Sequence, residues 1–421
     1  MTTITLALHG GEKTIAEKLP SFMNSEGRTF GPEEEALVLE ALRSGCLSRN
    51  GGRMVKGLEK DFAAALGVKH AIACSSGTAC VHLAVAALDL EPGDEVIVPP
   101  ITDIGSILPI LWQNAVPVFA DVSEQTMLLD PTSVEARITS RTRAVIAVHL
   151  AGAVCPMDEL QAICKKHKLV LIEDCSQAYW AEYNGRLVGS VGDMACFSLQ
   201  QSKHITCGEG GLMVTPNDMF AKRALLFSDK AWPRDTGSLG SFRFLFLAQN
   251  YRMSDLNGAV AWAQLPKVAA SVQRRRRTAD LLSEKIAGLT GVKAPLVPPG
   301  TAHSYWLYML RIESDSGTTA QEFGEALLAE GVPGWIRYIV DPLYLSPVIA
   351  EQKTYGTSGY PLSQFGWQEY ERGLCPSAER ALNQVIAIQW NENYEDEHVS
   401  RIAAAIHKVA SHFIAEVRDA D

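Results

Sequence analysis

Short apolar runs alternate with segments of helical periodicity along the first two-thirds of the chain. The runs are consecutive Val, Ile, Leu and Ala residues, which is typical of strands covered on both faces. In the intervening segments apolar residues recur at helical spacing, as do Leu160, Ile163 and Cys164 within Met157–Lys166. This alternation predicts an α/β fold with a mainly parallel seven-stranded sheet between helices. The predicted strands are His70–Cys74, Glu95–Val98, Val116–Ala120, Ala144–Val148, Val170–Ile172, Ala195–Ser198 and Gly211–Val214.

The pattern changes after about Leu265. The elements predicted beyond it are a long helix, an apolar aromatic run, a second helix and a final amphipathic helix, at Val268–Leu289, Tyr305–Ile312, Ala320–Glu330 and Glu397–Ile414. We therefore expect two domains. A large domain with an N-terminal arm would span residues 1–265, and a smaller C-terminal α/β domain would span residues 266–421.

Composition narrows the classes of function. The 421 residues include 38 Lys and Arg against 48 Asp and Glu, a formal net charge of −10, which argues against a nucleic-acid partner. We expect no membrane partner, since no window reaches the roughly 18 apolar residues of a membrane span, and the N-terminus lacks the segments of a secretion signal. The nine cysteines show no paired spacing, so we expect reduced thiols, no metal site and a cytoplasmic location.

The first segment that can carry chemistry is CSSGTA at 74–79, between a predicted strand and a predicted helix. Gly77 allows the backbone to approach an anion closely, and the dipole and free N–H groups of the helix start favour a phosphate. Ser76 and Thr78 add hydroxyl donors. The alternative is an N-capped turn without a ligand.

The second segment is LIEDCSQA at 171–178. Asp174 ends an apolar strand, at the edge where open α/β sheets place ligand groups. A carboxylate there can hold a cationic ring nitrogen, and Gln177 follows one short turn later. The alternative is an aspartate that caps the next helix.

The third segment, CFSLQQSKHITCGEGG at 196–211, carries the most weight. Lys203 follows a buried strand and precedes closely spaced glycines, which indicates a partly desolvated position. Desolvation disfavours the ammonium form, so the amine becomes available for a Schiff base. The alternative is an exposed loop lysine, and the apolar run that precedes Lys203 argues against this alternative.

In this order and spacing, the three segments resemble the DegT/DnrJ/EryC1/StrS family of pyridoxal-phosphate (PLP) aminotransferases of fold type I, which act on sugars and cyclitols. Matching segments also occur elsewhere, so the resemblance covers nearly the whole chain. They are GGRMVKGLE at 51–59, GDEVIVPPIT at 93–102, VHLAG at 148–152 and NYRM at 250–253.

The resemblance implies a role for each motif residue around PLP. Lys203 would be the catalytic residue that binds the cofactor covalently. Asp174 would pair with the pyridine nitrogen and keep it protonated, and Gln177 would lie near the phenolic oxygen. The phosphate would be held by Gly77 and Thr78 with Ser198, next to Ser76.

Asn250 of the NYRM segment would reach the phosphate of the neighbouring subunit. The resemblance thus implies a homodimer whose active sites are shared between subunits. Without the surrounding motif, Asn250 would be interpreted as a loop asparagine that caps the next helix.

Asp103 departs from the family pattern. It stands in PPITDIGS, where relatives carry an aromatic residue that stacks on the cofactor ring. Either another segment supplies the aromatic ring, or Asp103 faces an amino or hydroxyl group of the substrate. We include Asp103 among the residues at the cofactor site.

His204 also needs an assignment, because some relatives carry histidine in place of the lysine and act as PLP-dependent sugar dehydratases. The register K-x-x-T-x-G-E-G-G places Lys203 at the reactive position. Successive side chains on extended backbone point to opposite sides, so His204 is predicted to point away.

The resemblance therefore implies transfer of an amino group from an amino acid, glutamate or glutamine, to a keto-sugar or keto-cyclitol in the biosynthesis of amino sugars or aminocyclitols. Lys203 would move the proton as general base and acid. The alternatives are a sugar dehydratase or other carbanion chemistry on the same scaffold, and a non-catalytic PLP-binding protein.

Three further features have structural interpretations. Arg274–Arg277 is typical of a solvated helix face, with a contact to a partner subunit or anionic substrate as the alternative. His149 is either a structural histidine or a neighbour of the cofactor. Tyr305, Trp306 and Tyr308 are predicted to belong to the core of the smaller domain rather than to a sugar-binding surface.

Overall fold

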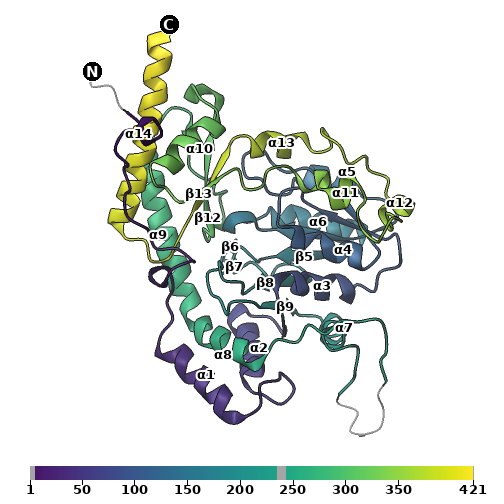
Figure 1. Ribbon diagram of the computed structural model, residues 1–421. Helices are drawn as coiled ribbons and strands as arrows, with labels where there is room; N and C mark the ends of the chain where they lie inside the picture. The colour runs from purple at the N-terminus through teal and green to yellow at the C-terminus, as the bar shows by residue number, and fades with distance from the viewer. Residues whose placement is uncertain (1–4, 235–242, 421) are drawn as a thin grey trace.

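The computed structural model describes residues 5–234 and 243–420. Its largest sheet has seven strands in the order β1-β9-β8-β5-β4-β2-β3 (Figure 1). Strand β9 runs antiparallel to both neighbours, while the series from β8 to β3 is parallel throughout. The predicted mainly parallel seven-stranded sheet is confirmed. The strands are β1 (His70–Cys74), β2 (Glu95–Val98), β3 (Val116–Phe119), β4 (Thr142–Val148), β5 (Val170–Asp174), β8 (Met194–Ser198) and β9 (Gly211–Thr215).

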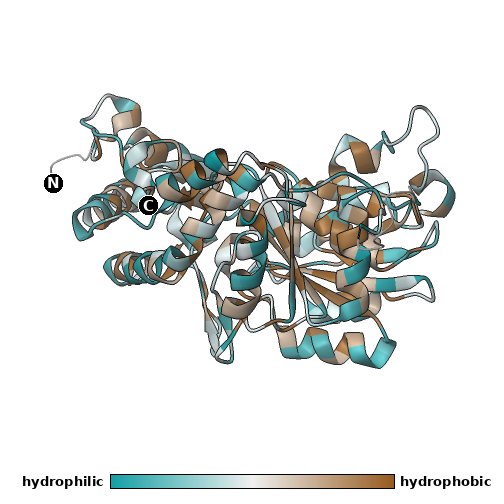
Figure 2. Cartoon of the chain, turned by 90° about the horizontal axis from the view of Figure 1, so that it is seen from below, coloured by the Kyte–Doolittle hydropathy of each residue, from teal (hydrophilic) through white to brown (hydrophobic). Residues whose placement is uncertain are grey.

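Helices cover both faces of this sheet, which is why its strands read as continuous apolar runs. Ala144–Val148 within β4 are all buried, and Figure 2 shows hydrophobic strands between amphipathic helices. The covering helices are α2 (Met54–Leu66), α3 (Gly77–Ala87), α4 (Leu108–Trp112), α5 (Pro131–Ala136), α6 (Met157–His167), α7 (Asp218–Ser228) and α8 (Asp255–Gln264).

A second, antiparallel sheet has the order β10-β12-β14-β13. The long helices α9 and α14 lie side by side next to it (Figure 1). Tyr305 and Tyr308 lie in the core between this second sheet and its helices, as predicted. The elements are β10 (Val292–Lys293), β12 (Leu307–Ile312), β13 (Gly334–Ile336), β14 (Val385–Gln389), α9 (Val268–Ile286), α10 (Ala320–Ala329) and α14 (Asp396–Ala420).

Two segments pack with a sheet distant from them in sequence. Leu6, Ile15 and Leu19 of the N-terminal arm belong to the core of the second sheet, whereas residues 343–382 pack on the core of the large sheet. The domain boundary near residue 265 stays a prediction. The remaining elements are α1 (Pro32–Ser44), α11 (Pro347–Ala350), α12 (Leu362–Phe365), α13 (Pro376–Leu382) and the small sheet of β6 (Glu182–Tyr183), β7 (Arg186–Leu187) and β11 (Thr301–Ala302).

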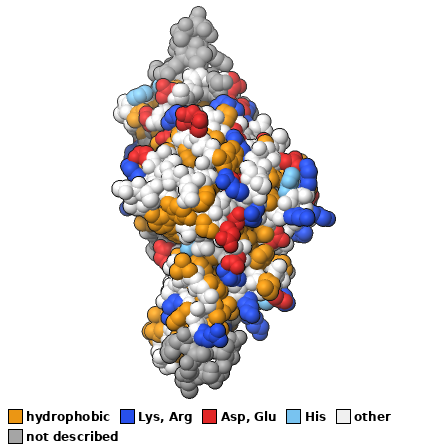
Figure 3. Space-filling view, turned by 90° about the vertical axis from the view of Figure 1, so that its right-hand side faces the viewer, with side chains coloured by type: hydrophobic (Ala, Val, Ile, Leu, Met, Phe, Trp, Pro, Cys, Tyr) orange, Lys and Arg blue, Asp and Glu red, His pale blue; other side chains and the backbone are white. Residues whose placement is uncertain are grey.

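The surface mixes hydrophobic, acidic and basic side chains on the face seen in Figure 3. Within residues 5–234 and 243–420, no helix is long and apolar enough to cross a membrane. All nine cysteines carry free thiols, and eight of them are buried.

Candidate active site

A cavity of about 360 Å³ lies where β5 and β8 end and α3 begins. The carboxyl ends of parallel strands meet at one edge of a sheet, which brings together residues distant in sequence. The structure places all but one of the predicted site residues on its walls. The predicted residues that line this cavity are Ser76, Gly77, Thr78, Asp103, Asp174, Gln177, Ser198 and Lys203.

The start of α3 forms the end of the cavity best suited to an anion. Ser76 caps this helix and accepts a hydrogen bond from the N–H of Ala79 at 3.1 Å, so the capping role considered from sequence is present. A Cβ on Gly77 would lie 2.7 Å from Cβ of Ser198. Only glycine therefore leaves space here for a ligand between the helix start and the Ser198 hydroxyl.

Both carboxylate oxygens of Asp174 are held in place. Ser106 donates to Oδ2 at 2.7 Å, and the backbone N–H of Ser176 donates to Oδ1 at 3.1 Å. The side chain is 5% exposed. Asp174 is therefore a buried, oriented acceptor aimed into the cavity, which suits it to bind a protonated ring nitrogen.

Neighbouring groups determine which way the amide of Gln177 points. Its Oε1 accepts from the backbone N–H of Ala151 at 2.7 Å, and its Nε2 donates to the hydroxyl of Tyr338 at 2.8 Å. Burial raises the pKa of Tyr338, so the hydroxyl keeps its proton and can donate in turn. Sequence reasoning missed Tyr338, because it lies in an irregular segment after β13 with no motif around it.

Among the described residues, Lys203 is the only lysine on the walls of this cavity, and its side chain is buried. Burial lowers the pKa of Lys203 to about 8, against the opposing effect of the carboxylates of Asp174 and Asp103. The neutral, nucleophilic amine is therefore more populated near physiological pH than in an ordinary lysine. Its Nζ lies 4.0 Å from the ring centroid of Trp306.

The backbone around Lys203 is held by the N-terminal arm. The guanidinium of Arg28 donates to the carbonyl of Lys203 at 2.9 Å and also to the carbonyl of Gln201. Trp306 donates from Nε1 to the carbonyl of Ser202 at 2.9 Å. These contacts fix the loop that carries the reactive amine.

His204 points away from the cavity, as predicted. Its Nε2 contacts the carbonyl of Ser304 at 3.0 Å in a buried position. Burial lowers the pKa of His204 well below its ordinary value. This geometry is that of a neutral structural histidine.

Asp103 caps a short 3₁₀ helix, Ile104–Ser106, and accepts from the N–H of Gly105 at 2.8 Å. It is exposed and lies on the cavity wall. A carboxylate thus occupies the position at which relatives are expected to carry an aromatic ring. The only aromatic ring among the described residues on this wall is that of Trp306.

Asn250 is the one predicted site residue that does not line the cavity of its own chain. It is exposed and forms an isolated β-bridge with Asp229. Its predicted contact with a neighbouring subunit stays a prediction.

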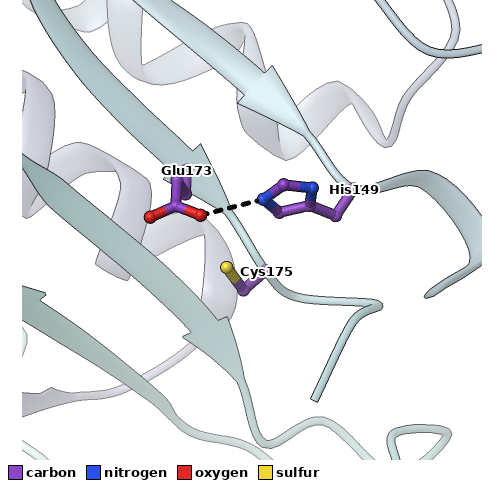
Figure 4. Close-up of side chains that lie close together, drawn as sticks. All are labelled: His149, Glu173 and Cys175. Atoms are coloured by element: carbon purple, nitrogen blue, oxygen red, sulfur yellow. Dashed lines mark hydrogen bonds and ion pairs between the residues drawn. The ribbon is translucent and has the colours of Figure 1, made fainter. Parts of the chain in front are cut away.

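His149, Glu173 and Cys175 lie close together at the carboxyl ends of β4 and β5, with ligand-type atoms within 4.8 Å of one another (Figure 4). The oxygens of Glu173 accept from His149 and from three backbone N–H groups, those of residues 189, 191 and 192. Nδ1 of His149 accepts from the N–H of Cys155 at 3.1 Å. These bonds use the lone pairs that a metal would need, so we interpret the cluster as structural support.

In the basic run on α9, Arg274 and Arg277 are exposed as predicted, whereas Arg276 is half-buried and Arg275 is buried. Arg275 is 1% exposed, because it points inward and pairs with Glu392 at 2.6 Å. It also donates to the carbonyls of Tyr305 at 2.9 Å and Trp390 at 2.7 Å. The sequence pattern could not predict this ion pair, because Glu392 lies 117 positions from Arg275.

The residues present fit pyridoxal phosphate. The space beside Gly77 at the start of α3 suits the phosphate, the oriented carboxylate of Asp174 suits the ring nitrogen, and the buried amine of Lys203 suits the aldehyde. The three groups line one cavity.

A sequence model of the DegT/DnrJ/EryC1/StrS aminotransferase family matches residues 29–407. The chain belongs to this family. It is a PLP-dependent aminotransferase, and the family assignment agrees with the three motifs around the cavity.

Similar proteins include GDP-perosamine synthase of Caulobacter vibrioides, 36% identical over 80% of this chain and 89% of the relative. L-glutamine:2-deoxy-scyllo-inosose aminotransferase of Streptoalloteichus tenebrarius is 34% identical over 84% of this chain and 85% of the relative. Among solved structures, DesV of S. venezuelae is 30% identical with a TM-score of 0.79, covering 90% of this chain and 94% of that one. DesI with its TDP-sugar product has 26% identity and a TM-score of 0.82, covering 99% of both chains.

Proposed function

We propose that this aminotransferase moves an amino group from glutamine or glutamate to a keto-sugar or keto-cyclitol. The observation that carries the proposal is the buried amine of Lys203 in one cavity with the oriented carboxylate of Asp174 and the start of α3. The names of two similar proteins support the acceptor class, since one is an aminotransferase for 2-deoxy-scyllo-inosose and another for UDP-N-acetyl-3-dehydro-alpha-D-glucosamine.

The proposed roles follow from the contacts of each residue. Bound PLP supplies an aldehyde and a ring that withdraws electrons from the reacting carbon. Asp174 holds the proton at the ring nitrogen, Gln177 donates from Nε2 towards the phenolic oxygen, and Ser76, Gly77, Thr78 and Ser198 surround the phosphate. Nζ of Lys203 removes the proton from the substrate carbon that bears the nitrogen and later returns a proton, and burial lowers the pKa of this amine towards neutrality.

The test of this function separates the two halves of the reaction. Pure protein is mixed with PLP and glutamine or glutamate, and the absorbance change that accompanies formation of pyridoxamine phosphate is followed. The pyridoxamine-loaded enzyme is then offered a panel of keto-sugars and keto-cyclitols, and products are identified by mass spectrometry. Full activity in Lys203→Ala would contradict the assigned role.

The functional unit that we propose is a homodimer in which Asn250 completes the site of the partner. Mixing Lys203→Ala with Asn250→Ala tests this arrangement. If the sites are shared, each mixed dimer regains one intact site, and a refolded equal mixture recovers about a quarter of wild-type activity. Recovery no greater than the sum of the two variants would reject the shared site.

We also propose a cytoplasmic location. Nine unpaired thiols suit a reducing compartment. Fractionation of the native host, followed by detection of the protein with an antibody, tests this location.

A further inference from the structure

A second cavity, of about 200 Å³, adjoins the Lys203 cavity. We call it the tryptophan pocket. Its main walls are Gln200, Ser202, Trp306, Trp335, Gln389 and Trp390. The first three of these also line the Lys203 cavity, so the two cavities lie next to each other on either side of these residues.

Three indole rings from different segments of the chain surround this space. Trp390 is buried at the end of β14, Trp306 is half-buried just before β12, and Trp335 on β13 is 42% exposed. Trp335 therefore leaves part of its ring accessible to a ligand. Flat apolar rings of this kind suit the C–H face of a sugar or cyclitol ring.

Two amide side chains offer hydrogen bonds to a ligand. Oε1 of Gln200 accepts from the N–H and hydroxyl of Ser202 at 2.8 and 2.7 Å, which leaves its NH₂ group free of an acceptor among the described residues. The side chain of Gln389 is half-buried, and no described residue hydrogen-bonds to it. Both amides can therefore bind hydroxyl groups at no loss of an internal bond.

The pocket carries no free charge. Arg275 is the only charged side chain on its described walls. Its Nε and Nη2 donate to Glu392, and its Nη1 donates to three backbone carbonyls. With the guanidinium neutralised and fully engaged, the pocket has no cation to offer a phosphate or carboxylate.

We propose that the tryptophan pocket binds the uncharged, hydroxylated part of the amino acceptor and excludes its phosphate groups. The inference deepens the proposed function and rests on it. The acceptor would place its carbonyl carbon at Lys203 and the adjoining hydroxylated ring surface against Trp306 and Trp335. Trp306 would then lie between the carbonyl carbon that reacts at Lys203 and the hydroxylated part that the tryptophan pocket binds.

The experiment uses PLP-loaded enzyme, Trp335→Ala and Gln389→Met. Trp367→Ala is the matched control, because Trp367 is also 42% exposed and lies outside the pocket. Saturation-transfer NMR measures contact with scyllo-inositol, D-glucose and N-acetyl-D-glucosamine, with inorganic pyrophosphate as competitor. The kcat/KM values of the donor and acceptor half-reactions are measured separately for each variant.

We expect saturation transfer from wild-type enzyme to at least one polyol, undiminished by pyrophosphate and about tenfold weaker in both pocket variants. The acceptor half-reaction should lose about tenfold more kcat/KM than the donor half-reaction, through KM, and Trp367→Ala should match the wild type. Displacement of the polyol by pyrophosphate, absence of polyol contact, or equal behaviour of Trp335→Ala and Trp367→Ala would overturn the proposal. Absence of the wild-type donor half-reaction would instead reject the proposed function.

Discussion

Ser106 donates a 2.7 Å hydrogen bond to Oδ2 of Asp174, although the two residues lie 68 positions apart. Ser106 is itself held by the hydroxyl of Thr102 at 2.8 Å, and both serine and aspartate are buried. The bond therefore fixes the rotation of the carboxylate that we assign to the ring nitrogen of PLP. Orientation by such a neighbour is a common requirement of buried functional groups.

Ser106→Ala is expected to lower kcat about tenfold, because one oxygen of Asp174 loses its donor while the carboxylate remains. Asp174→Asn should cost about 100-fold or more, since the negative charge is lost. Steady-state kinetics with a common donor and acceptor measures both, with exposed Ser400→Ala as control. Equal activity of Ser106→Ala and Ser400→Ala would show that the bond does not orient Asp174.

Gly77→Ala is expected to weaken PLP binding about tenfold or more. The added Cβ would lie 2.7 Å from Cβ of Ser198 and 2.9 Å from its hydroxyl oxygen, which closes the space assigned to the phosphate. Absorbance titration of the cofactor-free protein with PLP gives Kd. Gly31→Ala, at an extended position where the nearest atom is the flexible end of Glu33, should bind as the wild type does.

Lys203→Met should stabilise the cofactor-free protein at neutral pH. The folded-state pKa of Lys203 is about 8, below its ordinary value of 10.5, so the folded state binds the proton less tightly than the unfolded state. The protonated lysine therefore lowers the free energy of unfolding by about 3 kcal/mol below pH 8, and this loss of stability disappears as the pH rises to 10.5.

Urea unfolding of wild type and Lys203→Met at several pH values from 7 to 10.5 checks this. The free energies of unfolding of the two proteins should converge as the pH rises. A difference that stays constant across this range would mean that packing, rather than charge, sets the effect.

Glu173→Gln should destabilise the protein by about 3 kcal/mol at pH 7, because an amide N–H would face groups that now donate to a buried carboxylate. Burial alone would raise the pKa of Glu173, but the hydrogen bonds from His149 and the 189–192 loop hold it below its ordinary value. The carboxylate therefore contributes stability above pH 4.5, and this contribution is lost as the pH falls through the lower folded-state pKa.

Urea unfolding between pH 7 and pH 3 measures this contribution, with exposed Glu371→Gln as control. The gap between wild type and Glu173→Gln should narrow at the acidic end. A gap that widens on acidification would contradict the assigned charge state.

The large sheet and most of the cavity could be predicted from the sequence because their signals are local. A strand buried on both faces is apolar at every position, and a motif that follows such a strand falls at one known edge of a parallel sheet. Asp174 and Lys203 were found in this way, and Gly77 by the helix that follows it. The direction in which His204 points followed from backbone geometry.

Residues that reach the site from other parts of the chain could not be predicted, since nothing near them in sequence marks the contact. Tyr338 binds Gln177 from 161 positions away, and Arg275 finds its carboxylate 117 positions away. Trp306 was interpreted as core and instead forms the wall between two cavities. The local sequence pattern thus determined the sheet, its helices and the reactive side chains. The residues that orient those side chains were decided only by the tertiary structure. Tertiary packing brings together segments that are distant in sequence, and neither segment contains a local pattern that predicts the contact.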